Sequence, residues 1–201
     1  MTAESEPVAL QEVSTGPRAF GWWGMVWLIM TESALFAMLI FSYFFIRFQH
    51  PVWPPDGISD PELTLPLIMT AILWSSSLPV HLADRGIRRG STVWLRWGLA
   101  VGFVLGAVFL GMQLGIEYPE ILREFTPQTN AYGSLFFVIT GFHGFHVLVG
   151  LLFSLWTQFR ASQGAFDSRR HLTVQVFAMY WHFVDVVWLF VLLTVYISPR
   201  L

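Results

Sequence analysis

Five long apolar stretches, almost free of charge, dominate this sequence and decide what the chain can fold into. The 201 residues include 11 basic and 13 acidic side chains, of which only Glu32 and Asp185 fall within these stretches. A helix needs about 20 apolar residues to cross the bilayer hydrocarbon, and lipid offers no partner to backbone groups outside a helix or closed barrel. The strands of a membrane barrel would be about half as long and would alternate polar with apolar residues. The sequence therefore predicts an all-α, polytopic membrane bundle of five transmembrane helices, over residues 22–46, 63–83, 97–116, 132–158 and 172–197.

The connections between these stretches are short and suggest no second domain. Residues 49–62 contain four prolines and cannot continue a helix. Residues 84–91 form a basic turn in this interpretation. We therefore expect a polar N-terminal tail over residues 1–19, without the pattern of a signal peptide, and one transmembrane domain over residues 20–201.

Composition excludes several classes of protein. Charged residues make up 12% of the chain, about half the share of a soluble domain. This share argues against a cytosolic domain, a disordered tail and a basic nucleic-acid-binding protein. The absence of cysteine excludes disulfides, thiolate nucleophiles, iron–sulfur clusters and cysteine-based zinc sites. We identify no catalytic residue and no metal ligand set.

The arginines predict the orientation in the membrane. On one side of the membrane, the tail, the loops and the helix ends carry Arg18, Arg85, Arg88, Arg89, Arg96, Arg160, Arg169 and Arg170. On the other side they carry Arg47, Arg123 and Arg200. Basic residues concentrate in cytoplasmic loops, so the N-terminus is expected in the cytoplasm and the C-terminus outside. Basic groups at the first set of ends are candidate contacts for lipid headgroups: Arg85, Arg88, Arg89, Arg96 and His171. The opposite loops carry six carboxylates that form a solvated surface or attract a basic partner: Asp56, Asp60, Glu62, Glu117, Glu120 and Glu124.

Polar residues also recur near the middle of four of the five stretches. At 1.5 Å per residue, Glu32 lies roughly 15 Å into its helix. A carboxylate is expensive at that depth, so Glu32 and Asp185 should face protein and find hydrogen-bond donors, with His143 or His146 as the partner of Glu32. The predicted intramembrane polar layer comprises Glu32, Ser76, His143, His146, His182 and Asp185, with Ser75 and Ser77 beside it.

Three interpretations of this layer remain open. It could form a proton or ion relay, as in a transporter. It could hold a heme or metal through His143, His146 and His182, because facing helices offer imidazoles at one depth. It could also be a structural seam that fixes helix packing through hydrogen bonds. Glycines of the third stretch, at positions 98, 102, 106 and 111, face either a partner subunit or a neighbouring helix.

Two long motifs resemble one known family. They are YWHFVDVVWLF at residues 180–190 and YGSLFFVITGFHGFHVLVG at residues 132–150. Shorter ones are Thr31-Glu32, Trp53-Pro54-Pro55 and the serines 75–77. Together they resemble subunit III of the heme–copper oxidases, typified by cytochrome c oxidase, from about residue 20 to the end of the chain.

The resemblance implies a role. A subunit III carries no heme or copper, packs directly against catalytic subunit I in a complex with subunit II, binds phospholipids, and supports proton uptake and durability during turnover. Cytochrome c or a quinol would be the electron donor to the complex, in a bacterial plasma membrane, with no nucleic-acid partner. Glu32 matches the family's intramembrane glutamate, which is known to react with hydrophobic carbodiimides.

The sequence departs from the family at three points. The long family form has seven helices, and this chain resembles a short form without the first two. Gln175 stands where the family tends to have glutamate. The family's Gln-x-x-Glu-Tyr occurs here with one extra residue, from Gln113 to Glu117 and Tyr118. Alternatives are subunit III of a quinol oxidase or a nitric oxide reductase and, less favoured for want of internal repeats, a stand-alone proton or ion transporter.

Overall fold

The computed structural model describes residues 19–55, 57–59 and 61–201, and within them the fold is helical throughout, without strands. The elements are α1 (Phe20–Arg47), α2 (Thr64–Arg88), α3 (Thr92–Met112), the π-helix η2 (Gln113–Glu117), α4 (Tyr118–Glu124), α5 (Ala131–Ser162), α6 (Leu172–Val191), the π-helix η3 (Leu192–Ile197) and the 3₁₀-helix η4 (Ser198–Arg200). Five continuous helical segments are long and apolar enough to span a membrane, with α3–η2–α4 and α6–η3–η4 each forming one of them. The prediction of five transmembrane helices is confirmed.

The helices extend further than the sequence indicated, as the second and third spans show. The basic turn expected at residues 84–91 is largely helical, because α2 continues to Arg88 and α3 begins at Thr92. Asp84 and Arg88 form an ion pair of 2.6 Å across this last turn, a spacing that supports helix. The third span, which comprises α3, η2 and α4, likewise continues through Glu124, well into the loop expected after residue 116.

Local signals mark where the helices do begin and end. The side chains of Ser91 and Asn130 accept hydrogen bonds from the backbone N–H groups of Trp94 and Gly133 and so cap α3 and α5. Gly90 and Gly164, just after α2 and α5, adopt φ values of 80° and 72°, a left-handed conformation that glycine reaches at little cost.

The turn before α6 is held by one carboxylate. Asp167 accepts hydrogen bonds from the backbone N–H groups of Arg170 and Arg169 and from the Nε of Arg170. These contacts, the backbone bonds first, hold the pKa of Asp167 below its usual range. Arg170 is therefore already engaged with a carboxylate.

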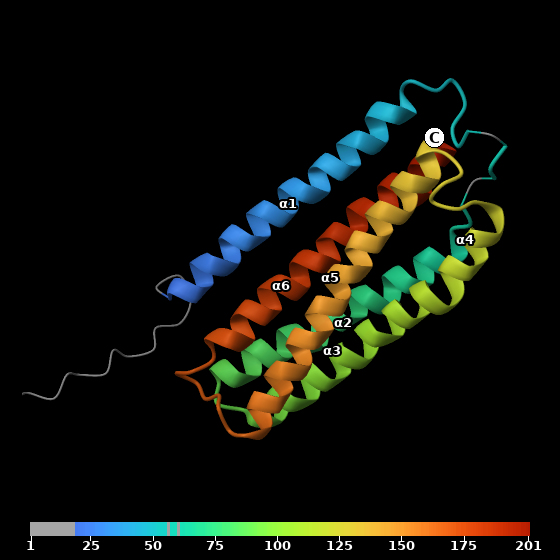
Figure 1. Cartoon of the computed structure of the whole chain (residues 1–201). Helices are drawn as coiled ribbons and strands as arrows, with labels where there is room; N and C mark the ends of the chain where they lie inside the picture. The colour runs from blue at the N-terminus through green and yellow to red at the C-terminus, as the bar shows by residue number, and fades with distance from the viewer. Residues whose placement is uncertain (1–18, 56, 60) are drawn as a thin grey trace, which may run out of the picture.

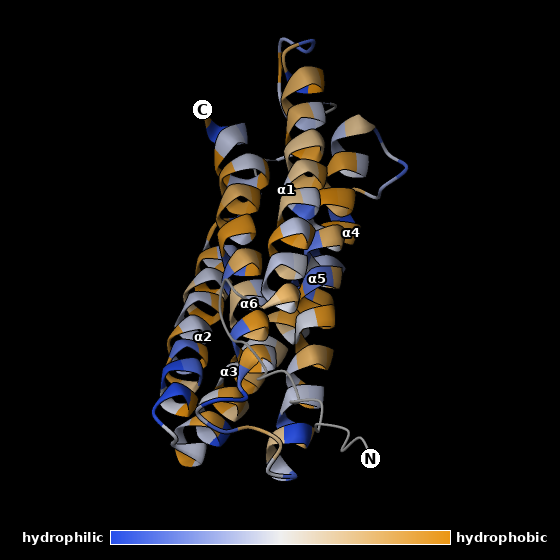
Figure 2. Cartoon of the chain, turned by 90° about the vertical axis from the view of Figure 1, so that its left-hand side faces the viewer, coloured by the Kyte–Doolittle hydropathy of each residue, from blue (hydrophilic) through white to orange (hydrophobic). Residues whose placement is uncertain are grey.

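The long helices run side by side, with α6 in the centre and α1 at the edge (Figure 1). Helix α6 packs against α1, α2 and α5, whereas α2 and α3 form the closest pair. Within the apolar stretch of α1, only 11% of the residues are buried inside the bundle. The corresponding share for the last span, Leu172–Arg200, is 61%. Hydrophobic residues cover the length of the helices and hydrophilic ones gather toward their ends (Figure 2). Residues 1–18 of the expected tail 1–19, with Arg18, and the carboxylates Asp56 and Asp60 lie outside the described residues.

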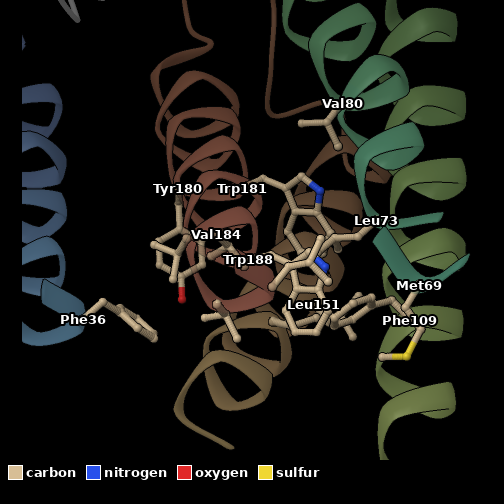
Figure 3. Close-up of a cluster of buried hydrophobic side chains, with 14 of the residues drawn as sticks. Phe36, Met69, Leu73, Val80, Phe109, Leu151, Tyr180, Trp181, Val184 and Trp188 are labelled. Atoms are coloured by element: carbon tan, nitrogen blue, oxygen red, sulfur yellow. The ribbon is translucent and has the colours of Figure 1, made fainter. Parts of the chain in front are cut away.

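Two tryptophans of α6 form the centre of the core. Trp181 and Trp188 are almost wholly buried and lie between α6 and the α2–α3 pair (Figure 3). A Cβ atom added at Gly106 or Gly150 would lie 2.6 or 2.7 Å from the ring of Trp181. These two glycines therefore make the space that the large indole ring occupies.

Candidate functional site: an intramembrane polar layer

The structure divides the predicted polar layer into separate clusters. Three imidazoles have three different partners, because His143 bonds to the Val184 carbonyl, His146 to Glu32 and His182 to Ser77. They do not converge on a common point where a heme or metal could be bound through all three. The described part of the chain also contains no group of three or more His, Asp and Glu side chains placed to hold a metal ion.

The first cluster joins α1 to α5. Oε2 of Glu32 lies 3.2 Å from Nε2 of His146, and Nδ1 of His146 lies 2.7 Å from the carbonyl oxygen of Phe142. A carbonyl only accepts, so Nδ1 carries a hydrogen and donates it. The contact between Nε2 and Oε2 then joins the imidazole of α5 to the carboxyl group of α1. The hydroxyl of Tyr180, on α6, donates a hydrogen bond to the backbone carbonyl of His146 and so links α6 to this cluster.

The second cluster joins α2 to α6. Ser77 donates a hydrogen bond to Oδ2 of Asp185, and its Oγ lies 2.9 Å from Nδ1 of His182. A serine hydroxyl has one hydrogen, which goes to Asp185, so His182 donates to Ser77. The cluster is thus a directed chain from the imidazole through the hydroxyl to the carboxylate.

The remaining two members of the layer are fully buried within the bundle. Ser76 is fully buried and accepts a hydrogen bond of 2.9 Å from Nε1 of Trp181. His143 is fully buried between the rings of Phe109 and Trp188, at centroid distances of 5.7 and 4.8 Å. For these two residues the interpretation as a packing seam describes the geometry best.

The candidate lipid contacts differ among themselves. Arg85, Arg88, Arg89 and Arg96 are exposed, and Arg96 lines a groove of about 360 Å³ with Trp97, Ala100 and Gln158. His171, in contrast, is buried with 7% of its surface exposed, so it belongs to the interior of this end of the bundle.

Sequence reasoning misplaced Glu117. The sequence places it in a loop, among carboxylates that form a solvated surface or attract a basic partner, but it is only 2% exposed and accepts a hydrogen bond of 2.7 Å from Tyr196. It ends the π-helix η2, which begins at Gln113. A π-turn bonds residue i to i+5 and so accommodates one extra residue in a helix. The π-turn accommodates the extra residue that the resemblance indicates between Gln113 and Glu117, while both side chains remain buried.

Deleting Gly115 from η2 is expected to leave the unfolding temperature close to that of the parent chain, because a Cβ atom added there would have no neighbour within 4 Å and the π-turn can relax to an α-turn. Deleting Val104 instead should be severe, since every residue of α3 beyond it rotates by about 100° relative to α2 and α5, against which α3 packs. Thermal unfolding of the two variants compares them, and equal losses would contradict the role given to the π-turn.

The fold and these clusters define a class: a multi-pass membrane bundle with paired carboxyl and imidazole groups at mid-depth.

Comparison with known proteins identifies the family. The family model of cytochrome c oxidase subunit III matches residues 12–199. The chain is 35% identical over 178 residues to cytochrome c oxidase subunit 3 of Thermostichus vulcanus. This alignment covers 88% of this chain and 87% of the relative. The chain is 38% identical over 175 residues to that of Synechocystis, covering 87% and 74%, and 38% identical over 181 residues to that of Marchantia polymorpha, covering 87% and 67%. The chain belongs to the cytochrome c oxidase subunit III family.

Proposed function

We propose that this chain is the accessory, integral-membrane subunit III of a cytochrome c oxidase in an aerobic respiratory chain. The observation that carries the proposal is the family match along nearly the whole chain. In this role the chain packs against catalytic subunit I, in one complex with subunit II, and the heme and copper centres belong to those partners. Two of the relatives named above are cyanobacterial, which favours a bacterial plasma membrane.

The chain's own residues would support proton uptake and stability during turnover. Glu32 and His146 form a hydrogen bond between a carboxyl group and an imidazole, at a depth where water is scarce. Phospholipid headgroups would bind at exposed basic positions, of which Arg96 has a groove beside it. Both roles rest on the family resemblance and on this geometry.

Purification of the complex through a tag on this chain tests the proposal. We expect heme-bearing partners to copurify and the preparation to oxidise cytochrome c with oxygen. Oxidation of a quinol instead would favour the quinol-oxidase alternative. A chain that is stable alone in detergent and moves ions in vesicles would be a transporter, and the proposal would be wrong.

Glu32→Gln is expected to leave assembly and oxygen reduction intact, because the redox centres lie on other chains and the amide still bonds to His146. Labelling by a hydrophobic carbodiimide should disappear, and any loss should arise only in sustained turnover or proton uptake. Glu32→Ala should cost about 1–3 kcal/mol, since it leaves a buried imidazole nitrogen unpaired. Loss of oxygen reduction in an assembled Glu32→Gln complex with normal heme content would contradict the accessory role.

Cysteine labelling is expected to place the ends of the chain on opposite sides of the membrane, with the N-terminus in the cytoplasm. The chain has no native cysteine, so a single thiol at Thr2 or Leu201 reports without background from this subunit. An impermeant maleimide should reach position 201 from outside and position 2 only after the membrane is opened. The reverse pattern would refute the assignment.

A further inference from the structure

Four glutamates line one cavity near the end of the bundle that carries the C-terminus. The cavity has a volume of about 110 Å³, and its acidic residues are Glu62, just before α2, and Glu117, Glu120 and Glu124 of the third span. The rest of the lining is largely apolar. Figure 1 shows α4, which carries two of these glutamates, at the same end of the bundle as the C-terminus. We call this the acidic cavity.

Three of these glutamates share one face of a continuous helical segment. Glu117, Glu120 and Glu124 are spaced three and four residues apart across η2 and α4. Like charges at this spacing repel each other. Within the part of the chain that the structure describes, no arginine or histidine forms an ion pair with any of the four glutamates. Arg200 lies nearby but donates its hydrogen bond to the backbone carbonyl of Pro61, so the negative charge of the cavity is left without a cation from this chain.

Glu117 supplies an independent observation that points to a ligand. It is only 2% exposed, and one carboxyl oxygen, Oε1, accepts the hydrogen bond from Tyr196. The other oxygen, Oε2, is buried and has no hydrogen-bond partner among the described residues. A buried carboxylate that is only half satisfied is costly. Because Glu117 lines the cavity, a small ion inside the cavity can neutralise its charge, whereas a side chain of another protein is too large to reach it.

Volume and ligand chemistry restrict what that ion can be. The cavity has room for a cation and a few water molecules, since one water takes up about 30 Å³. Carboxylate oxygens suit the hard divalent cations Mg²⁺ and Ca²⁺. Among the described residues, no three acidic or histidine side chains are placed around a single bare ion. This favours Mg²⁺, which is usually held by one or two carboxylates and keeps several waters, over Ca²⁺, which takes more protein oxygens.

We propose that the acidic cavity is a binding site for a hydrated divalent cation of the Mg²⁺ type. Glu117 balances the charge of the ion at the buried end of the cavity. Glu62, Glu120 and Glu124 are exposed and bind the ion through its waters. Because these carboxylates come from two segments, the ion links the start of α2 to the end of the third span. The site does not depend on the oxidase role, so failure of the proposed function would leave it standing.

Binding of Mn²⁺, which occupies the same oxygen sites as Mg²⁺ and has an EPR signal, tests the site. The protein is purified through a tag on this chain, with any partners that copurify, and bound Mn²⁺ is counted from the loss of the free-ion signal. We expect one Mn²⁺ per chain to be displaced by excess Mg²⁺. Glu117→Gln and Glu120→Gln should each weaken its binding by about 10- to 100-fold, the usual cost of losing a group that supports a metal site.

Asp167→Asn is the matched control, because it removes the same charge from the turn before α6, which is not part of the cavity. Its Mn²⁺ binding should equal that of the parent. Equal binding in the parent and in both cavity variants would overturn the proposal.

Thermal unfolding separates loss of the site from misfolding. Glu117→Gln keeps the size of the side chain and an oxygen that accepts from Tyr196, and Glu120→Gln changes an exposed residue, so both variants should fold. An ion that binds only the folded chain stabilises it. Millimolar Mg²⁺, at constant ionic strength, should therefore raise the unfolding temperature of the parent and of Asp167→Asn but not of the two cavity variants. An equal rise in all four proteins, or no rise in the parent, would overturn the site.

Discussion

Gly98→Ala is expected to destabilise the chain by about 1–3 kcal/mol or more, because it forces α2 and α3 apart. A Cβ atom at this position would lie 2.3 Å from the carbonyl oxygen of Pro79 and 2.8 Å from the Cβ of Ala83. The first of these is a backbone atom and cannot move aside by a rotamer change. The two helices form the closest pair in the bundle, so the clash must shift one against the other.

Gly111→Ala is the matched control, since that glycine lies on the same helix and has no atom within 4 Å of its added Cβ. Alanine also has the higher helix propensity, so this variant should be neutral or slightly more stable. Thermal unfolding of the chain in its purified complex compares the two. A Gly98→Ala protein as stable as Gly111→Ala would show that the helices can separate without cost, contrary to this structure.

The positions of the transmembrane helices could be predicted from the sequence because charge is excluded from hydrocarbon. The ends of the helices could not be predicted, because a residue such as Arg88 can lie within a helix while its long side chain still reaches the membrane interface. The glycines of α3 illustrate a second limit. Spacing indicated close packing but not the neighbour, and the structure shows that Gly98 and Gly102 face α2, Gly106 faces Trp181, and Gly111 faces outward.

The polar layer was predictable in depth but not in direction around each helix. Counting residues along each helix gives the depth, and equal depth correctly predicted that Glu32 lies beside an imidazole of α5. Residues three apart still differ by about 60° around the helix axis, enough to face different neighbours. His146 therefore meets α1 while His143 turns to α6, a difference that the sequence pattern does not contain.

Glu117 shows how an irregular backbone defeats pattern reading. The sequence placed it beyond the end of the third span, among carboxylates of a loop. The π-turn continues the helix past that point and turns the side chain inward to Tyr196. The one signal available was the extra residue between Gln113 and Glu117, which indicates an insertion but not how the backbone accommodates it.

Trp181→Ala is expected to have the largest effect on packing, because this indole fills the space that Gly106 and Gly150 leave open. In lipid the usual gain from removing apolar surface from water is absent, so the cavity decides the cost. A residual cavity of roughly 140 Å³ at about 24 cal/mol per Å³ corresponds to a loss of about 3 kcal/mol. The variant also removes the N–H donor to Ser76, which is fully buried.

Trp97→Ala is the control for this change, since Trp97 is 68% exposed on α3 and its removal leaves no enclosed cavity. Trp181→Phe separates the two contributions, because it keeps most of the ring volume and loses the hydrogen bond. We expect unfolding temperatures in the order Trp97→Ala, Trp181→Phe and Trp181→Ala, from highest to lowest. If Trp181→Phe were as damaging as Trp181→Ala, the bond to Ser76 rather than the filled volume would hold α2 against α6.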